Sequence, residues 1–467
     1  MAKVPPPAAE HITWLESERT VPRRFVRPLL RFTYIESASG GILLFAAVAA
    51  LIWANSPLGD SYESFWATEF ELTIGPLHLV ENFRHVVNDG FMTIFFFVVG
   101  LEIKRELVNG DLRNPKAAAL PVIAALGGMI FPAAIFVLIA GDTPGAFHGW
   151  GIPMATDIAF AVGVVALLGS RVPVGGKLFL LALAIVDDIG AITVIAVFYT
   201  EDLALGYLLA TIGVLAAMWA AQRVRIRSLA FYLPMGFMAW FFLFESGVHA
   251  TLAGVAIGLL TPAKSMYTDR EYHDRTERIL DRYDFDRDAP LGEERIDFDA
   301  LEVSDLARES VAPLYRIENA LHPWSSFLVV PIFALANAGV RFAGVDLVDA
   351  ATHPVAVGVA LGLLLGKTVG ISLFAWLAVR LRLGVLPRMV SWRHVVGLAA
   401  VAGIGFTVAL FVSDLAFRAH ELEDLSKTGI FIGSALAGIL GYLILRSLAP
   451  RNTSAPQSSE TGNVAGR

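Results

Sequence analysis

The sequence has 467 residues, of which 55% are hydrophobic and only 17% charged, and its formal net charge is −7. A soluble domain carries about 25% charged residues, so this composition indicates a protein of the lipid bilayer rather than a soluble one. There is no cysteine, which excludes disulfides, thiol chemistry and thiolate metal sites. We expect no enzymatic activity, no cofactor and no nucleic-acid partner.

The chain begins with a polar arm, residues 1–31, that contains both Pro and Arg. The arm lacks the short apolar core and the small-residue cleavage site of a signal peptide. We therefore expect the first membrane helix to act as an uncleaved anchor.

Long apolar blocks occupy most of the remaining chain. A helix of about twenty residues crosses a hydrocarbon core of about 30 Å, and the longest blocks exceed that length. They predict an all-α polytopic membrane protein with about twelve transmembrane helices, at residues 36–54, 84–103, 118–140, 147–168, 176–199, 205–222, 228–243, 247–261, 319–340, 356–379, 394–417 and 428–447.

Lys and Arg gather in alternate connections between these predicted spans. They are dense in the arm and after the second, fourth, sixth and tenth spans, whereas the connections after the first and third spans have none. Cytoplasmic loops carry the excess of Lys and Arg, so we expect both termini to be cytoplasmic.

The predicted domains follow from this topology. The membrane domain takes residues 32–263, with spans one to eight, and residues 316–447, with spans nine to twelve. Between them lies a cytoplasmic loop, residues 264–315, dense in both signs of charge. The tail, residues 448–467, is rich in Ser, Thr, Gly and Asn, which predicts disorder.

A short alternating segment lies in the first outer connection. Residues 70–79 alternate around Gly75 and Pro76, which predicts a small β-hairpin near residues 69–80. Two strands alone are marginally stable, so we expect the hairpin to pair with that of a second copy in a homodimer.

Four ionisable residues lie deep within predicted spans: Asp157, Asp187, Asp188 and Lys367. Each costs at least about 2.5 kcal/mol at the bilayer centre, and such residues usually face a cavity and serve a function. The alternative is that these charges serve only helix packing. Packing alone hardly explains two adjacent carboxylates in an apolar helix.

Adjacent helix positions point about 100° apart, so Asp187 and Asp188 cannot share one environment. One can face an ion cavity while the other faces a neighbouring helix that carries Lys367. Carboxylate oxygens bind either a hard cation such as Na⁺ or a proton. Competition for one site, with access alternating between the two sides, is antiport.

Two predicted spans contain residues that interrupt helices. Pro153 precedes Asp157 in the fourth span, and Gly403 and Gly405 lie in the eleventh. Such residues allow a break, although a mild kink or close packing would also explain them. At broken helices, Asp157 could balance positive N-terminal ends and Lys367 negative C-terminal ends.

Several segments together resemble the NhaA sodium/proton antiporter family, over most of residues 36–447. They are Val99–Leu107, Ala155–Ala161, Leu181–Ala191, Ser246–Gly254, Leu321–Trp324, Phe333–Val340 and Gly366–Lys367. The resemblance implies inverted repeats, with spans four and eleven broken and crossing. It also implies electrogenic export of Na⁺ or Li⁺ in exchange for H⁺ across the bacterial cytoplasmic (inner) membrane.

The resemblance assigns roles to the buried residues. Asp188 becomes the main Na⁺ ligand, and Asp187 its partner, which exchanges protons and pairs with Lys367. Thr156 and Asp157 line the crossing.

The resemblance also suggests four residues for the response to pH. Glu102, Glu106 and Glu318 would lie near the cytoplasmic mouth, and His249 is the fourth. A helix end exposed to solvent would explain Glu102 and Glu106 equally well. For His249, we favour a histidine that is packed in the protein interior over a pH sensor. The loop 264–315 is longer than the family leads us to expect, and its role is open.

Three other functions compete with this interpretation. An intramembrane aspartyl protease needs its two aspartates on separate helices, and a sodium-coupled symporter needs no proton-carrying pair. A K⁺/H⁺ or broader monovalent cation/H⁺ antiporter is the main alternative, because the sequence predicts oxygen ligands but not the size of their cavity.

Overall fold

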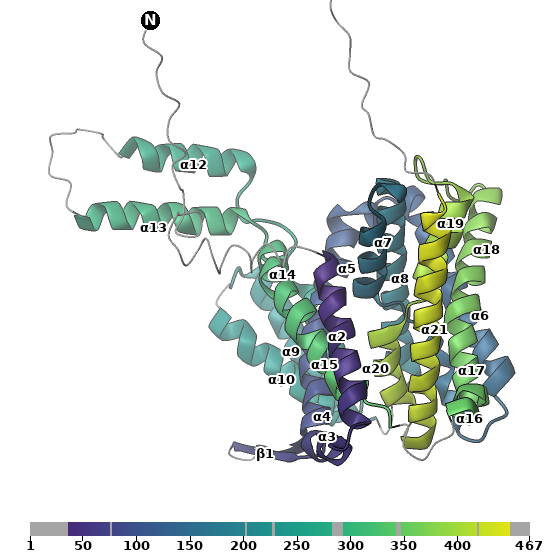
Figure 1. Ribbon diagram of the computed structural model, residues 1–467. Helices are drawn as coiled ribbons and strands as arrows, with labels where there is room; N and C mark the ends of the chain where they lie inside the picture. The colour runs from purple at the N-terminus through teal and green to yellow at the C-terminus, as the bar shows by residue number, and fades with distance from the viewer. Residues whose placement is uncertain are drawn as a thin grey trace, which may run out of the picture.

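The computed structural model describes residues 36–74, 77–200, 203–226, 229–282, 293–341, 347–417 and 420–448. This part of the chain is almost entirely helical, and most helices stand side by side in one bundle (Figure 1). The predicted arm, residues 1–31, and nearly all of the predicted tail lie outside the described residues.

Eight helical segments are long and apolar enough to cross a membrane. They are α4–η3–α5 (Phe83–His85, Val86–Phe91, Met92–Asn109), α6 (Pro115–Ala140), η5–α7–η6 (Ala146–Met154, Ile158–Leu168, Gly169–Arg171), α8 (Val174–Phe198), α9 (Leu205–Arg223), α14–η7–α15 (Pro313–Trp324, Ser325–Val329, Val330–Asn337), α17–η8–α18 (Pro354–Leu361, Gly362–Gly366, Lys367–Arg380) and α21 (His420–Arg446).

Two bent pairs raise this number to as many as ten spans if each pair counts as one. The first, α2 (Glu36–Ala54) and α3 (Gly59–Trp66), bends by 114°, and the second, α19 (Trp392–Val401) and α20 (Phe406–Ala416), bends by 48°. Two shorter apolar helices, α10 (Leu229–Glu245) and α11 (Thr251–Leu260), fall on two further predicted ranges. A multi-pass helical membrane protein is therefore confirmed, and the number of twelve spans stays a prediction.

The helix that begins with Lys367 packs unusually closely against α6. A Cβ atom added to Gly127 would lie 2.2 Å from the carbonyl oxygen of Gly370, and one added to Gly370 would lie 2.1 Å from that of Gly127. Small residues let membrane helices approach in this way. This contact fixes α18, and with it Lys367 one turn away, against the core.

Non-helical backbone interrupts two segments at the same level of the bundle. Residues 155–157 are extended between η5 and α7, and residues 402–405 separate α19 from α20. The two interruptions touch, because the backbone N–H of Asp157 donates to the carbonyl of Ile404 at 2.6 Å. Backbone groups freed by a break thus find partners inside the protein, as they must at membrane depth.

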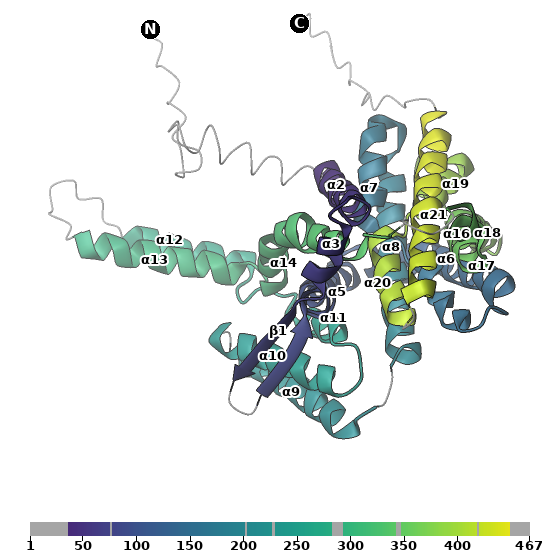
Figure 2. The same ribbon diagram turned by 60° about the horizontal axis from the view of Figure 1, so that its bottom comes forward.

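A two-stranded antiparallel hairpin lies at one end of the bundle, which we call the hairpin face (Figure 2). Strand β1 (Glu69–Ile74) pairs with β2 (Leu77–Asn82), with Glu69 opposite Asn82 and Ile74 opposite Leu77. The hairpin projects beyond the helices, so its edges meet no other strand among the described residues.

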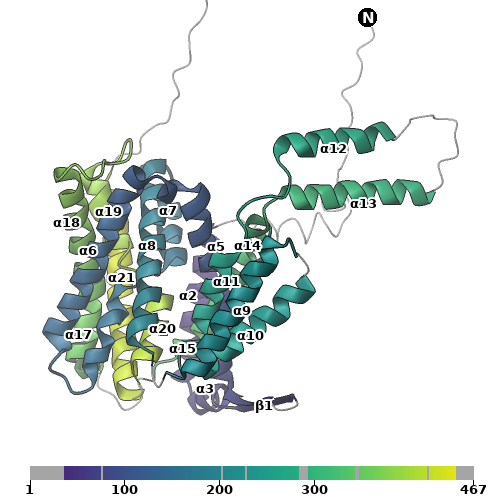
Figure 3. The ribbon, with the colours of Figure 1, turned by 180° about the vertical axis from the view of Figure 1, so that it is seen from behind.

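The charged segment predicted as a loop contains two helices, α12 (Asp269–Arg282) and α13 (Glu293–Ser310). They lie against each other and project sideways from the end of the bundle opposite the hairpin face (Figures 1 and 3). Ile279 and Leu306 are buried between them, so a narrow apolar seam holds two otherwise polar helices together. We call this end the α12–α13 face. Two short helices complete the fold, η4 (Asp111–Arg113) and α16 (Leu347–Thr352).

Candidate functional site

Lys367 lies in the middle of the bundle with its side chain fully buried. Its ammonium group donates to Asp187 Oδ2 and, at 3.1 Å, to Thr156 Oγ1. The Thr156 hydroxyl reaches the same carboxylate oxygen at 2.6 Å and the carbonyl of Ala402 at 2.8 Å. A hydroxyl has only one proton to donate, so it serves either acceptor at a time. Thr156 can therefore change its partner when the charge of Asp187 changes.

The second oxygen of Asp187, Oδ1, is buried and has no hydrogen-bond partner within the described part of the chain. A buried carboxylate oxygen without a donor is costly, and such an atom calls for a chemical explanation. This oxygen is a point where a proton or a cation can attach without displacing Lys367.

Asp188 has different surroundings, as expected for the next residue of a helix. Its side chain is 5% exposed, and none of the described residues gives it a hydrogen bond or an ion pair. The charges nearest to it include the carboxylates of Asp187, Glu102 and Asp157, as well as Lys367. One carboxylate of α8 therefore has a fixed counter-charge and the other does not. A proton or a small cation can supply what Asp188 lacks.

Asp157 lies where two helices begin. Its Oδ1 accepts the backbone N–H of Phe160 at 3.1 Å and so caps the N-terminus of α7. Its Oδ2 accepts both the backbone N–H and the hydroxyl of Thr407, at 3.0 and 2.5 Å, in the first turn of α20. Helix N-termini carry partial positive charge, so one buried carboxylate balances two of them.

The three predicted glutamates lie together at the α12–α13 face. Arg105 forms ion pairs with Glu318, which is buried, and with Glu106, at 3.6 Å. Glu102 lies one helical turn before Glu106 on α5, and its Oε1 is 4.0 Å from Nε2 of His322. The Glu318 Oε2 is buried without a hydrogen-bond partner in the described chain. The three glutamates therefore share one cluster of charged side chains at this face.

His249 lies apart from the glutamates. It precedes α11, whose first turns pack on the beginning of α5, since a Cβ on Gly254 would meet the carbonyl of Thr93 at 2.3 Å. Its Nε2 is 2.8 Å from the carbonyl oxygen of Tyr199. The structure therefore places His249 toward the hairpin face and does not bring it together with Glu102, Glu106 and Glu318.

Sequence reasoning missed several partners that shape the site. Thr407 and Arg105 are the first two, and the side chains of Asn88, Asn337 and Asp414 form a third group toward the hairpin face. The sequence carried a signal for Thr407, since it follows the Gly403–Gly405 break as Thr156 follows Pro153. No local pattern marks Asn88 or Asn337, which meet from two distant helices.

Among the described residues, no group of three or more His, Cys, Asp or Glu side chains is placed to hold a metal ion. The carboxylate oxygens of Asp187 and Asp188 and the hydroxyl of Thr156 are hard ligands, of the kind that binds a small alkali-metal cation or a proton.

Comparisons with known proteins agree with this chemistry. A family model described as "Na+/H+ antiporter 1" matches residues 30–445. An "Na(+)/H(+) antiporter NhaA" of Rhodopirellula baltica is 45% identical over 433 residues, 92% of this chain and 96% of the relative. An "Na(+)/H(+) antiporter NhaA 2" of Syntrophotalea carbinolica is 47% identical over 89% of this chain and 95% of its own length. Another, of Sorangium cellulosum, is 44% identical over 97% of this chain and 96% of its own.

Proposed function

Because the chain belongs to the NhaA family of Na⁺/H⁺ antiporters, we propose that it exports Na⁺ in exchange for H⁺, electrogenically, at a single site formed by Asp187 and Asp188. The observation that carries this proposal is the unequal pairing of these two carboxylates, of which only Asp187 is held by Lys367. Members of an antiporter family transport ions and do not catalyse a chemical reaction.

Asp188 binds the cation in this mechanism. It is a buried carboxylate without a fixed partner, so it takes either Na⁺ or a proton, and the two compete. The Asp187 Oδ1 and the Thr156 hydroxyl provide further oxygens for the cation. Li⁺ is also a hard cation that prefers such ligands, so the same site transports it.

The ion pair of Asp187 and Lys367 explains electrogenic exchange by counting charges. With Na⁺ on Asp188 and the pair intact, the site is neutral. When a proton replaces Na⁺ and a second proton neutralises Asp187, Lys367 leaves one net positive charge. Each cycle then carries one extra charge inward, which is worth about 2.3 kcal/mol per 100 mV of membrane potential.

The interrupted segments supply the alternating access. Helix α7 starts at Asp157 and α20 starts beside it, so a change at the central site acts on both half-helices through one side chain. We regard these segments as the broken, crossing helices of two inverted repeats, built from predicted spans three to five and ten to twelve.

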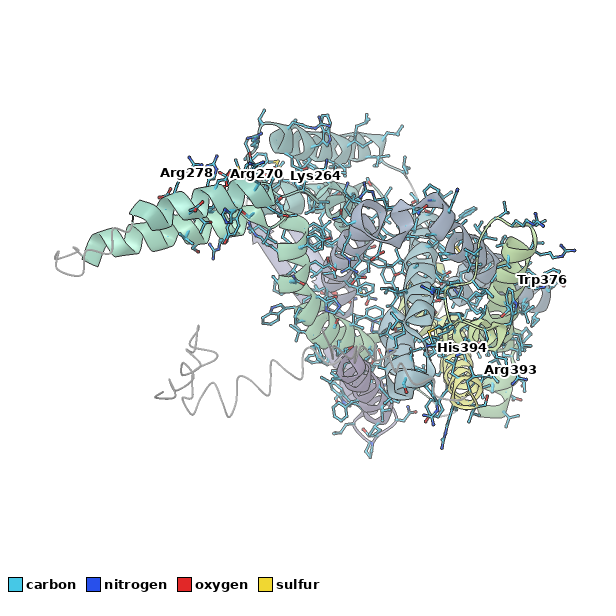
Figure 4. The ribbon with its side chains drawn as sticks, turned by 90° about the horizontal axis from the view of Figure 1, so that it is seen from above. Lys264, Arg270, Arg278, Trp376, Arg393 and His394 are labelled. Atoms are coloured by element: carbon cyan, nitrogen blue, oxygen red, sulfur yellow. The ribbon has the colours of Figure 1, made fainter. Side chains whose placement is uncertain are left out.

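The charge distribution supports an inside orientation for the α12–α13 face. Figure 4 views this face and shows Lys264, Arg270 and Arg278 around the projecting helices, with Arg393 at the start of α19. The first described helix begins, and α21 ends, on this same face (Figure 1). Cytoplasmic ends of membrane helices carry excess Lys and Arg. We therefore place both termini in the cytoplasm and the hairpin outside the bacterial inner membrane.

The cluster around Arg105 then faces the cytoplasm. Arg105 is shared between Glu106 and Glu318, so protonation of either glutamate redistributes the pairs. We assign Glu102, Glu106 and Glu318 to the pH response. His249, on the other side of the protein, tunes the packing beneath Tyr199.

The hairpin forms the proposed homodimer contact. Two strands are marginally stable alone, and the outer edges of β1 and β2 present unpaired backbone groups to a second copy.

Proton flux in everted membrane vesicles tests the function. Na⁺ and Li⁺, added separately, should each release protons from acidified vesicles, whereas K⁺ should not. Vesicles from cells without the protein serve as the control. A K⁺ response equal to that of Na⁺ would favour the alternative, a broader monovalent cation/H⁺ antiporter.

A further inference from the structure

The two projecting helices α12 and α13 enclose an open groove of about 610 Å³. The apolar seam of Ile279 and Leu306 lines it. On the α13 side it is lined by Glu302, Asp305 and Glu309, at the spacing i, i+3 and i+7, so these carboxylates lie along one side of the helix. The groove therefore combines a row of anionic groups with an apolar surface.

The cations that line the groove are held on the α12 side. The guanidinium of Arg275 lies 4.4 Å from the ring centroid of Tyr267, and Nε of Arg278 donates to a backbone carbonyl of its own helix at 3.0 Å (Figure 4). On the α13 side, neither Asp305 nor Glu309 forms an ion pair with a side chain in the described part of the chain. Helix α13 as a whole has seven acidic residues and two basic ones. A cationic partner would supply the charge that this side of the groove lacks.

A segment of fitting chemistry lies in the N-terminal arm of the chain itself. Residues 19–31 contain five arginines and no acidic residue. Four apolar residues stand between the arginines, namely Phe25, Val26, Leu29 and Leu30. Guanidinium groups bind carboxylates through paired hydrogen bonds, and apolar side chains gain free energy by covering an apolar surface. The segment thus matches both parts of the groove.

The arm joins the described chain close enough to the groove to reach it. Helix α2 starts at Glu36 and α14 starts at Pro313, both at the α12–α13 face (Figure 1). The two segments run side by side, because α2 packs along α15 and Asn55 donates to the carbonyl of Val340 at 2.7 Å near the other end. Arg24 lies twelve residues before Glu36, and an extended chain of that length spans about 40 Å. Helix α13 is only about 27 Å long, at about 1.5 Å per residue.

We propose that residues 19–31 dock in the groove between α12 and α13, with their arginines on Glu302, Asp305 and Glu309 and their apolar side chains on the seam. The docked arm ties the projecting helices to the beginning of α2. The competing arrangement places the same arginines on anionic lipid headgroups. The groove is favoured because it offers carboxylates and an apolar surface together, within the reach of the arm. This inference concerns a contact within the chain and does not depend on the transported ion.

A disulfide between introduced cysteines tests the contact without background, because the chain has no cysteine. We call Val26→Cys with Asp305→Cys the groove pair. In purified protein in detergent, mild oxidation should cross-link the groove pair at least fivefold faster than Val26→Cys with Ser304→Cys. Ser304 is the matched control, since it is exposed and lies about 200° around α13 from both Glu302 and Leu306. Equal rates for the two pairs would overturn the proposal.

A mixture of two proteins distinguishes docking within one chain from docking on a second copy. Protein with Val26→Cys alone is mixed with protein with Asp305→Cys alone and oxidised in the same way. We expect less than one-tenth of the cross-linking rate of the groove pair. A rate equal to that of the groove pair would assign the arm to a second copy and overturn the intramolecular contact.

Charge reversal tests whether opposite charges hold the arm in the groove. In the groove pair, Arg23→Glu with Arg24→Glu should slow cross-linking at least fivefold. Adding Glu302→Lys and Glu309→Lys should restore the rate to within twofold, which a variant that had merely lost its structure could not do. Unchanged cross-linking after the arginine reversal, or no recovery in the full swap, would contradict the proposed pairing.

Liposomes test the membrane as the alternative partner of the arm. The groove pair is oxidised in liposomes of phosphatidylcholine alone and in liposomes that contain one-third phosphatidylglycerol. We expect the two rates to agree within twofold, because the arm stays in the groove. A fall of tenfold or more in the anionic liposomes would mean that the arginines bind lipid headgroups instead, and the proposal would be wrong.

Discussion

Thr407 donates both its backbone N–H and its hydroxyl to one oxygen of Asp157, at 3.0 and 2.5 Å, across a sequence separation of 250 residues. Asp157 also caps α7, so this pair of residues ties together the beginnings of two helices from opposite halves of the chain. The residue next to Thr156 is thereby attached to both of the interrupted segments that we propose to move during transport.

The hydroxyl of Thr407 should be important for stability. Thr407→Val keeps the shape but removes one donor from a buried carboxylate, which should cost about 1.5–3 kcal/mol. We expect a lower melting temperature in detergent and weaker Na⁺/H⁺ exchange. Thr193→Val is the matched control, because the Thr193 hydroxyl bonds only within its own exposed helix turn. Equal melting temperatures for the two variants would show that the contact contributes little.

Lys367 should tolerate replacement by another cation but not truncation. Lys367→Arg keeps a charge beside Asp187, so we expect electrogenic exchange with a shifted pH dependence. Lys367→Ala leaves the buried Asp187 uncompensated and should destabilise the protein by about 3–5 kcal/mol. Current measurements on supported membranes distinguish the mechanisms. A folded Lys367→Arg variant with electroneutral exchange would mean that the lysine itself carries the second proton.

The projecting helices α12 and α13 should be dispensable for transport. The backbone N–H of Leu314 donates to the carbonyl of Pro262 at 3.2 Å, so the chain enters and leaves this unit at adjacent points. Deleting residues 268–312 and joining the ends by a short Gly-Ser linker should preserve Na⁺ affinity and maximal rate. A shifted pH profile alone would assign the helices to regulation, and loss of Na⁺ binding in a well-inserted protein would refute the prediction.

The contact of α6 with α18 should not accept a methyl group. Gly127→Ala would push a Cβ against the carbonyl of Gly370, at 2.2 Å, and overpacking of this kind costs about 1–3 kcal/mol or more. Gly163→Ala in α7 meets no atom within 4 Å and should be neutral or slightly stabilising. Thermal unfolding followed by size-exclusion chromatography compares the two, and equal behaviour would contradict the packing argument.

The sequence predicted those features that follow from local chemistry. Hydropathy predicted the membrane helices. The cost of placing a charge in lipid indicated that Asp157, Asp187, Asp188 and Lys367 are functional residues. Helix geometry predicted that the adjacent aspartates differ, and the structure places Asp187 against Lys367. The family resemblance is confirmed by the comparisons.

Features created by tertiary contact were not predictable in the same way. Asn88 and Asn337 lie on two different helices and form a hydrogen bond. No residue spacing in either segment predicts this contact. The helices α12 and α13 were missed because their composition is so strongly charged that it favours a loop, whereas their short apolar seam forms only when Ile279 packs near Leu306. The role of each site residue stays a prediction.

The most direct test of the account measures Na⁺ binding to purified protein by calorimetry, comparing the unaltered chain with Asp188→Asn and Asp187→Asn. We expect Asp188→Asn to abolish Na⁺ binding and Na⁺-driven proton release while the protein remains folded, because the amide cannot supply the anionic ligand. Asp187→Asn should exchange poorly, since its proton coupling is disturbed. Preserved Na⁺ binding and exchange in Asp188→Asn, with near-normal apparent affinity, would contradict the assignment of Asp188 as the cation ligand.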